Sequence, residues 1–132
     1  MESIGVPVTA LDETAAGPVA ACRISPAVDL LFSRWTTPIL WLLNQGAPLR
    51  FVELERRLGA TGKVLTQRLR QLERDGLVQR RYYAEVPPRA EYEITELGRS
   101  LAPVFAALAE WTDAHLPSVE KARDEYSGPL PR

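Results

Sequence analysis

Four glycines divide the middle of this 132-residue chain into short segments, and so limit the length of any helix there. They are Gly46, Gly59, Gly62 and Gly76. Glycine often ends a helix because, without a side chain, it adopts the left-handed backbone conformation at little cost. The segments 38–45, 50–58 and 63–75 lie between these breaks and are rich in leucine. The pattern predicts three short helices that pack around a shared core.

Proline marks the start of two helices. Ser25–Pro26 and Thr37–Pro38 each place a capping hydroxyl ahead of a proline, whose missing N–H has no partner in the first turn anyway. We expect Ser25 to cap a helix that reaches about Phe32. We expect Thr37 to cap a second helix, which its dense apolar run ILWLL should bury on most sides.

The second half of the chain predicts a hairpin and a long helix. The β-prone runs LVQRRYYA and AEYEIT flank residues 85–89, where two prolines make a rigid tip. Thr95 then stands where it can cap a last helix, residues 96–115, which Pro103 should bend and which should end before Pro117.

The order of these elements predicts a mainly α fold with a small β-wing (α+β). It is the order of a winged helix-turn-helix with an added C-terminal dimerisation helix. We expect this domain to span residues 22–117, between a loose N-terminal arm, 1–21, and a flexible C-terminal tail, 118–132. The last helix carries more apolar residues than a small wing covers, which favours a homodimer.

Charge is unevenly distributed along the chain. The formal net charge is −1, yet residues 62–81 carry six basic and two acidic side chains. Within this segment the predicted helix over 63–75 has a narrow core stripe of Leu65, Leu69 and Leu72. At about 100° per residue, the side opposite the stripe carries no carboxylate. The polar residues on or beside that side are Lys63, Thr66, Gln67, Arg70, Gln71 and Arg74.

Such a helix suits the major groove of double-stranded DNA, because one face packs on its own domain while the other offers partners for phosphates and bases. The neighbouring hairpin adds Arg80, Arg81 and Arg89. Side chains alternate along a strand, so we expect only one of Arg80 and Arg81 to face the DNA, and the sequence leaves open which one.

Other classes of function receive less support. The chain shows no nucleophile–base pair, metal cluster or glycine-rich phosphate loop, so we expect no enzyme, metal or cofactor, and we expect His115 to be solvated. No apolar run approaches a membrane span, and residues 1–21 carry no Lys or Arg, which favours a cytoplasmic protein without a secretory signal. The serious alternative is a winged helix that makes protein–protein contacts without DNA.

Several motifs together resemble the HxlR family of winged helix-turn-helix regulators. They are CRISPAVDLLFSRWTTPIL, LRFVELERRL, GKVLTQRLRQLERDGLVQRRYY and VPPRAEYEITELGRSL, and the match covers about residues 22–111. The resemblance implies a homodimeric transcriptional regulator, such as a repressor, whose first and last helices pair between subunits. It implies that the helix over 63–75 reads DNA, with Thr61 as its expected cap, and that the hairpin is the wing.

Two hypotheses concern sensing, the first raised by the resemblance and the second by the aromatic residues. Cys22 is the single cysteine and precedes a predicted helix, which would favour its thiolate and a redox role through an intersubunit or mixed disulfide. Alternatively, aromatic and apolar side chains on the terminal helices line a pocket for a small aromatic effector, or simply form the dimer interface. These side chains are Trp35, Trp41, Phe105, Leu108 and Trp111.

Overall fold

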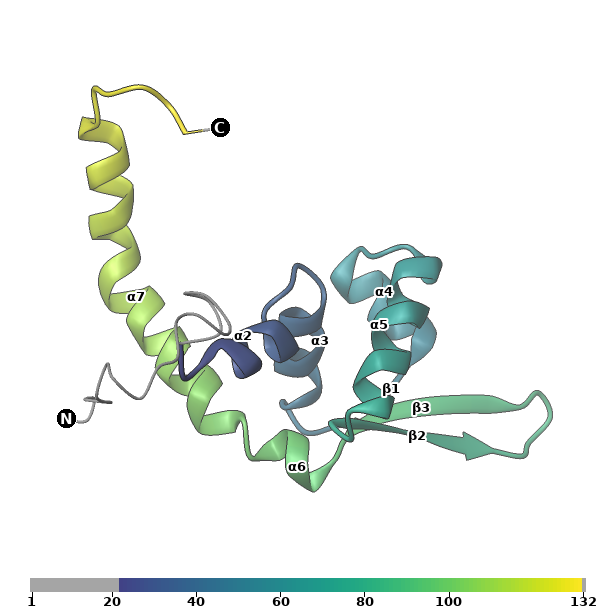
Figure 1. Ribbon diagram of the computed structural model, residues 1–132. Helices are drawn as coiled ribbons and strands as arrows, with labels where there is room; N and C mark the ends of the chain where they lie inside the picture. Colours follow the sequence, from purple (N-terminus) through teal and green to yellow (C-terminus); the bar gives the residue numbers. More distant parts are fainter. Residues whose placement is uncertain (1–21, 132) are drawn as a thin grey trace, which may run out of the picture.

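The computed structural model describes residues 22–131, and Figure 1 shows their arrangement. The elements in chain order are α2 (Ser25–Leu31), α3 (Thr36–Leu43), β1 (Leu49–Arg50), α4 (Phe51–Leu58), α5 (Gly62–Arg74), β2 (Val78–Tyr83), β3 (Arg89–Ile94), α6 (Glu96–Arg99) and α7 (Ala102–Glu125). The predicted winged helix-turn-helix with a C-terminal helix is confirmed. The predicted N-terminal arm lies outside the described residues.

The predicted hairpin is the larger part of a three-stranded antiparallel sheet. Its strand order is β1-β3-β2, and Val78 of β2 lies opposite Ile94 of β3. The sequence did not predict β1, a two-residue strand in which Leu49 lies opposite Tyr92. So short a strand has no period that a sequence pattern can reveal. It nevertheless ties the start of α4 to the wing.

The core forms where α3, α4 and α5 meet the sheet. The leucine stripe predicted for α5 is confirmed, since Leu65, Leu69 and Leu72 are each at most 2% exposed. Leu54 of α4 and Ile39, Leu40 and Leu43 of α3 complete the most deeply buried set. Trp41 corrects the expectation for α3, because 44% of it is exposed on the side of the helix away from this core.

Both predicted caps near the N-terminus are wrong. The N-cap of α2 is Ile24, because the Ser25 N–H already donates to the Cys22 carbonyl at 3.0 Å and the helix starts one residue earlier. Thr37 lies inside α3, and its hydroxyl donates to the Leu31 carbonyl at 2.6 Å. The Thr36 N–H donates instead to Ser33 Oγ at 3.0 Å. The connection between α2 and α3 is short, so its own serine reaches the helix start.

The predicted last helix is two helices. Thr95 caps α6 as expected, accepting the Gly98 N–H at 3.0 Å. The chain then breaks, and Pro103 lies in the first turn of α7, where its missing N–H is harmless, rather than inside one long helix. Pro117 does not end α7, which continues to Glu125 through residues that the sequence pattern assigns to the tail. Figure 1 shows α7 projecting from the body on the side away from the wing.

Candidate nucleic-acid interface

Helix α5 presents one polar face to solvent. Thr61 caps the helix as predicted, because its hydroxyl accepts the Val64 N–H at 3.3 Å, and the leucine stripe fixes which way the helix faces. The side chains opposite that stripe are exposed, as the helical wheel predicts. They are Lys63, Gln67, Arg70 and Arg74, with Thr66 and Gln71 half-buried at the edges.

The charges on this face differ in how far they are already compensated. Arg74 forms an ion pair with Asp75, with Nε 3.1 Å from Oδ1. Gln71 accepts a hydrogen bond from Arg68 Nη1 at 3.1 Å, so part of its polar group is occupied. Within the described part of the chain, Lys63 and Arg70 form no ion pair. The uncompensated positive charge therefore lies toward the N-terminal and middle turns of α5.

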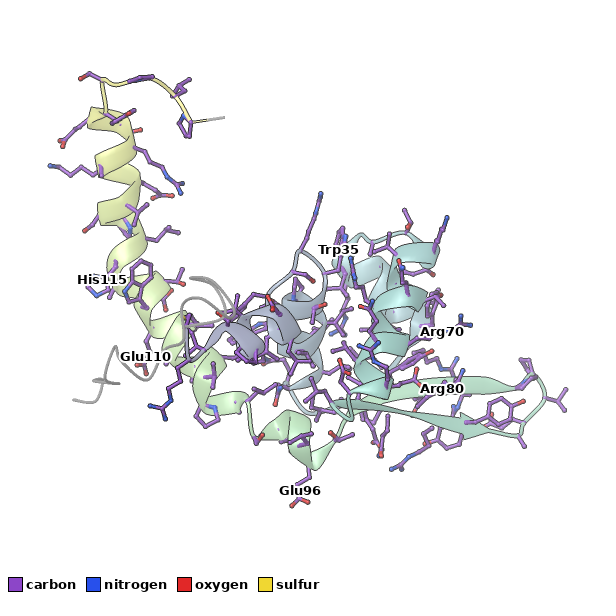
Figure 2. All side chains as sticks on the ribbon, in the orientation of Figure 1. Trp35, Arg70, Arg80, Glu96, Glu110 and His115 are labelled. Atoms are coloured by element: carbon purple, nitrogen blue, oxygen red, sulfur yellow. The ribbon has the colours of Figure 1, made fainter. Side chains whose placement is uncertain are left out.

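Arg80 and Arg81 lie on opposite faces of the hairpin, as the alternation of the strand predicts. Arg80 stands opposite Tyr92 in the register, and Arg81 stands opposite Glu91. On the α5 side, Arg80 and Tyr92 share a depression of about 440 Å³ with Thr66 and Arg70. Figure 2 shows Arg70 on α5 and Arg80 on the wing below it. Arg80 is thus the wing arginine next to the exposed face of α5.

Arg81 and Arg89 are held by partners on the other face of the wing. Arg81 Nη2 lies 2.6 Å from Glu93 Oε2, and a hydrogen bond with Tyr83, followed by Glu93, raises the pKa of Arg81. Arg89 stacks on the Tyr83 ring at 4.3 Å and pairs with Glu85 at 3.3 Å. Both guanidinium groups therefore already have partners within the hairpin.

The aromatic residues predicted for a pocket or interface are only partly brought together. Trp41, Phe105 and Leu108 line a shallow groove of about 440 Å³ between α3 and α7, and the Trp41 and Phe105 rings meet edge to face. Trp111 lies further along α7, 53% exposed, with its ring 5.3 Å from that of His115. Trp35 packs against the core at the start of α3 and does not line this groove.

Cys22 lies exposed just ahead of α2. The Ile24 N–H, followed by the Ser25 hydroxyl, lowers the pKa of its thiol. Hydrogen bonds to sulfur stabilise the thiolate, so a larger fraction of Cys22 is ionised near neutral pH than of an ordinary cysteine.

Two residues near α5 were missed by sequence reasoning. Glu73 reaches from α5 toward Arg80, with Oε1 3.9 Å from Arg80 Nε, and Tyr92 lies buried beside this pair. The hairpin register, which places Tyr92 opposite Arg80, is the signal that would have found Tyr92.

In the described range 22–131, no helix combines the length and apolarity needed to cross a bilayer.

Comparison with known proteins finds a matching family model and similar regulators. The model of the HxlR-like helix-turn-helix family matches residues 30–120. The uncharacterised HTH-type transcriptional regulator YtfH of Escherichia coli is 44% identical over 105 residues, which cover 79% of this chain and 82% of that protein. An uncharacterised HTH-type regulator of Methanothermobacter thermautotrophicus is 44% identical over 91 residues, 68% of this chain and 69% of that protein.

A similar arrangement occurs among solved structures. The redox regulator HypR in its reduced form superposes with a TM-score of 0.71 at 33% identity, covering 76% of this chain and 99% of that one. All three relatives carry names of regulators, and none carries the name of an enzyme.

Proposed function

The chain belongs to the HxlR-like helix-turn-helix family of transcriptional regulators, and from this premise we propose that it binds operator DNA as a homodimer. Each subunit places α5 in a major groove, and its wing follows the flanking backbone. Lys63, Gln67, Arg70 and Arg74 provide the central contacts, with Thr66 and Gln71 at the edges of the same face. Two half-sites about one helical turn apart supply the specificity that a single short helix lacks.

One observation supports this proposal above the others: Arg70, an uncompensated cation of α5, shares a depression with Arg80 of the wing. Lys63 and Arg70 lie opposite the buried leucine stripe, so they reach a partner without disturbing the core. A DNA backbone offers a row of phosphates that such a surface neutralises, with release of counterions. Among the wing arginines, Arg80 is therefore our choice for the DNA contact, whereas Arg81 and Arg89 brace the hairpin.

A salt titration of duplex binding tests this function. Fluorescence anisotropy with duplexes from the chain's own promoter region should show log K falling linearly with log salt concentration, by about 0.9 for each phosphate neutralised. Binding to no duplex at any salt concentration would favour the alternative, a winged helix that contacts other proteins.

The homodimer proposal rests on the apolar side chains that the described fold leaves uncovered. On α7, Val104, Leu108 and Trp111 are 43%, 42% and 53% exposed, and in the region of α2 Leu30 and Phe32 are 40% and 41% exposed. Figure 1 shows α7 extending beyond the rest of the body, where no other described element covers it. A second copy that packs its own α2 and α7 on this surface removes it from water.

Substituting Trp111→Glu should weaken the dimer by at least about tenfold, because a carboxylate would replace a large apolar side chain at a buried interface. Light scattering after size-exclusion chromatography measures the result, against a subunit mass of 14.7 kDa. Val86→Glu adds the same charge at the fully exposed wing tip and should leave the mass unchanged. A Trp111→Glu protein as dimeric as wild type would contradict the proposal that this face of α7 forms the dimer interface.

Redox sensing at Cys22 is a second candidate function, favoured by the exposed thiol with its lowered pKa and by the similarity to a redox regulator. With one cysteine per chain, oxidation joins two Cys22 thiols from different subunits, or one Cys22 and a small thiol, into a disulfide. Two electrons and two protons then pass to the oxidant.

Treatment with diamide should therefore change the operator affinity of the wild type about fivefold or more, the range of ordinary allosteric coupling. The Cys22→Ser protein should not respond. Anisotropy titrations before and after treatment measure the change, and reduction with dithiothreitol should reverse it. Equal affinities of treated wild type and treated Cys22→Ser would exclude this role.

A further inference from the structure

Glu73 is the single carboxylate of α5, and it does not point to open solvent. Its side chain is 28% exposed, on the flank of the helix that faces the wing. A negative charge so close to a DNA-binding face repels phosphates, so by simple electrostatics it weakens the activity proposed for this helix. The contacts of Glu73 with the wing suggest what compensates for this repulsion.

The Glu73 carboxylate lies between the helix and the wing. Its Oε1 is 3.9 Å from Nε of Arg80, whose own side chain is 56% exposed. Tyr92 lines the same depression as Glu73 and Arg80, and the pKa of its phenol responds to both of these groups. Burial and then Glu73 raise the pKa of Tyr92, while Arg80 acts in the opposite direction.

The Arg80 side chain is long, and without a partner it would populate many rotamers. The Glu73 carboxylate, 3.9 Å away and beyond hydrogen-bond distance, attracts the guanidinium and so favours rotamers that keep it within the depression shared by Thr66, Arg70 and Tyr92.

We propose that Glu73 is a positioning residue, which holds the Arg80 guanidinium beside Arg70 so that both arginines meet the same stretch of DNA backbone. This inference rests on the DNA-binding function proposed above and adds to it. It assigns to the recognition helix an acidic residue that strengthens DNA binding through an arginine on another element. The Glu93–Arg81 pair on the opposite face of the wing is a built-in comparison, since it has the same chemistry but lies away from α5.

The sign of the effect tests the proposal. In the wild-type background, Glu73→Gln should weaken binding to the operator duplex by about fivefold, because no carboxylate then holds the Arg80 guanidinium beside Arg70. In an Arg80→Gln background there is no guanidinium to position, so the same substitution should tighten binding slightly by removing a repulsive charge. A residue needed only for folding would lower affinity in both backgrounds.

Two further variants sharpen the experiment. Glu73→Asp keeps the repulsive charge but is one methylene too short to reach Arg80, so it should bind at least as weakly as Glu73→Gln. Glu93→Gln removes the same charge from the other wing face and should not weaken binding. All variants are compared in the full-length protein by anisotropy across a salt series.

The outcomes separate this inference from the function on which it rests. If wild type binds duplex with a salt slope but Glu73→Gln binds more tightly, or weakens binding equally in both backgrounds, the positioning role is wrong and DNA binding stands. If wild type shows no salt-dependent binding, both are wrong.

Discussion

Replacing Arg70 by alanine should cause the largest loss of DNA binding of any single substitution on the α5 face. Arg70 is exposed, forms no ion pair within the described residues, and shares its depression with Arg80. An arginine that contacts a base edge through two hydrogen bonds contributes about 1–3 kcal/mol to binding, and a homodimer loses that contribution at both half-sites. The salt slope should also fall by about 1 for each phosphate that the variant no longer neutralises.

Arg81→Ala is the matched control for this substitution. It removes the same charge from the same region, but Arg81 lies on the opposite wing face and already pairs with Glu93 at 2.6 Å. We expect its operator affinity to stay within about twofold of wild type, because Arg81 faces away from α5 and its charge is already paired with Glu93. Equal losses for Arg70→Ala and Arg81→Ala would mean that overall charge, rather than the α5 face, governs binding.

Adding one methyl group at Gly98 should have the largest effect on stability. Gly98 is buried in α6, and a Cβ there would lie 2.4 Å from the Leu77 carbonyl oxygen and 2.5 Å from Ile94 Cδ1. The carbonyl cannot retreat freely, because it accepts the Thr95 N–H at 3.1 Å. We expect Gly98→Ala to lower the free energy of unfolding by about 3 kcal/mol and the melting temperature by roughly 10–20 °C.

Gly62→Ala adds the same methyl group without the clash. A Cβ at Gly62 would meet first the end of the Glu55 side chain, at 3.0 Å, which can move aside. Alanine also favours the helix that begins there, so the melting temperature should hold or rise slightly. Thermal unfolding followed by circular dichroism compares the two proteins. A Gly98→Ala protein as stable as Gly62→Ala would show that α6 shifts readily on the sheet.

Much of the fold could be predicted from local pattern. The leucine stripe of α5, its Thr61 cap and the hairpin all depend on residues within a few positions of one another, so the sequence displays them directly. The missed strand depended on a partner from elsewhere in the chain, since β1 exists only because Leu49 and Arg50 lie against β3. The wrong cap of α3 depended on the conformation of the α2–α3 connection, which brings Ser33 Oγ to the Thr36 N–H.

The candidate site divides in the same way. Sequence by itself determined the polar face of α5 and the opposite facing of Arg80 and Arg81, because helix and strand periods are local properties of the chain. Only the tertiary structure decided which arginine lies beside α5, how Glu73 meets Arg80, and which aromatic residues of α3 and α7 share a groove. Those relations depend on how separate elements pack, and packing is set by the complete core rather than by any one segment.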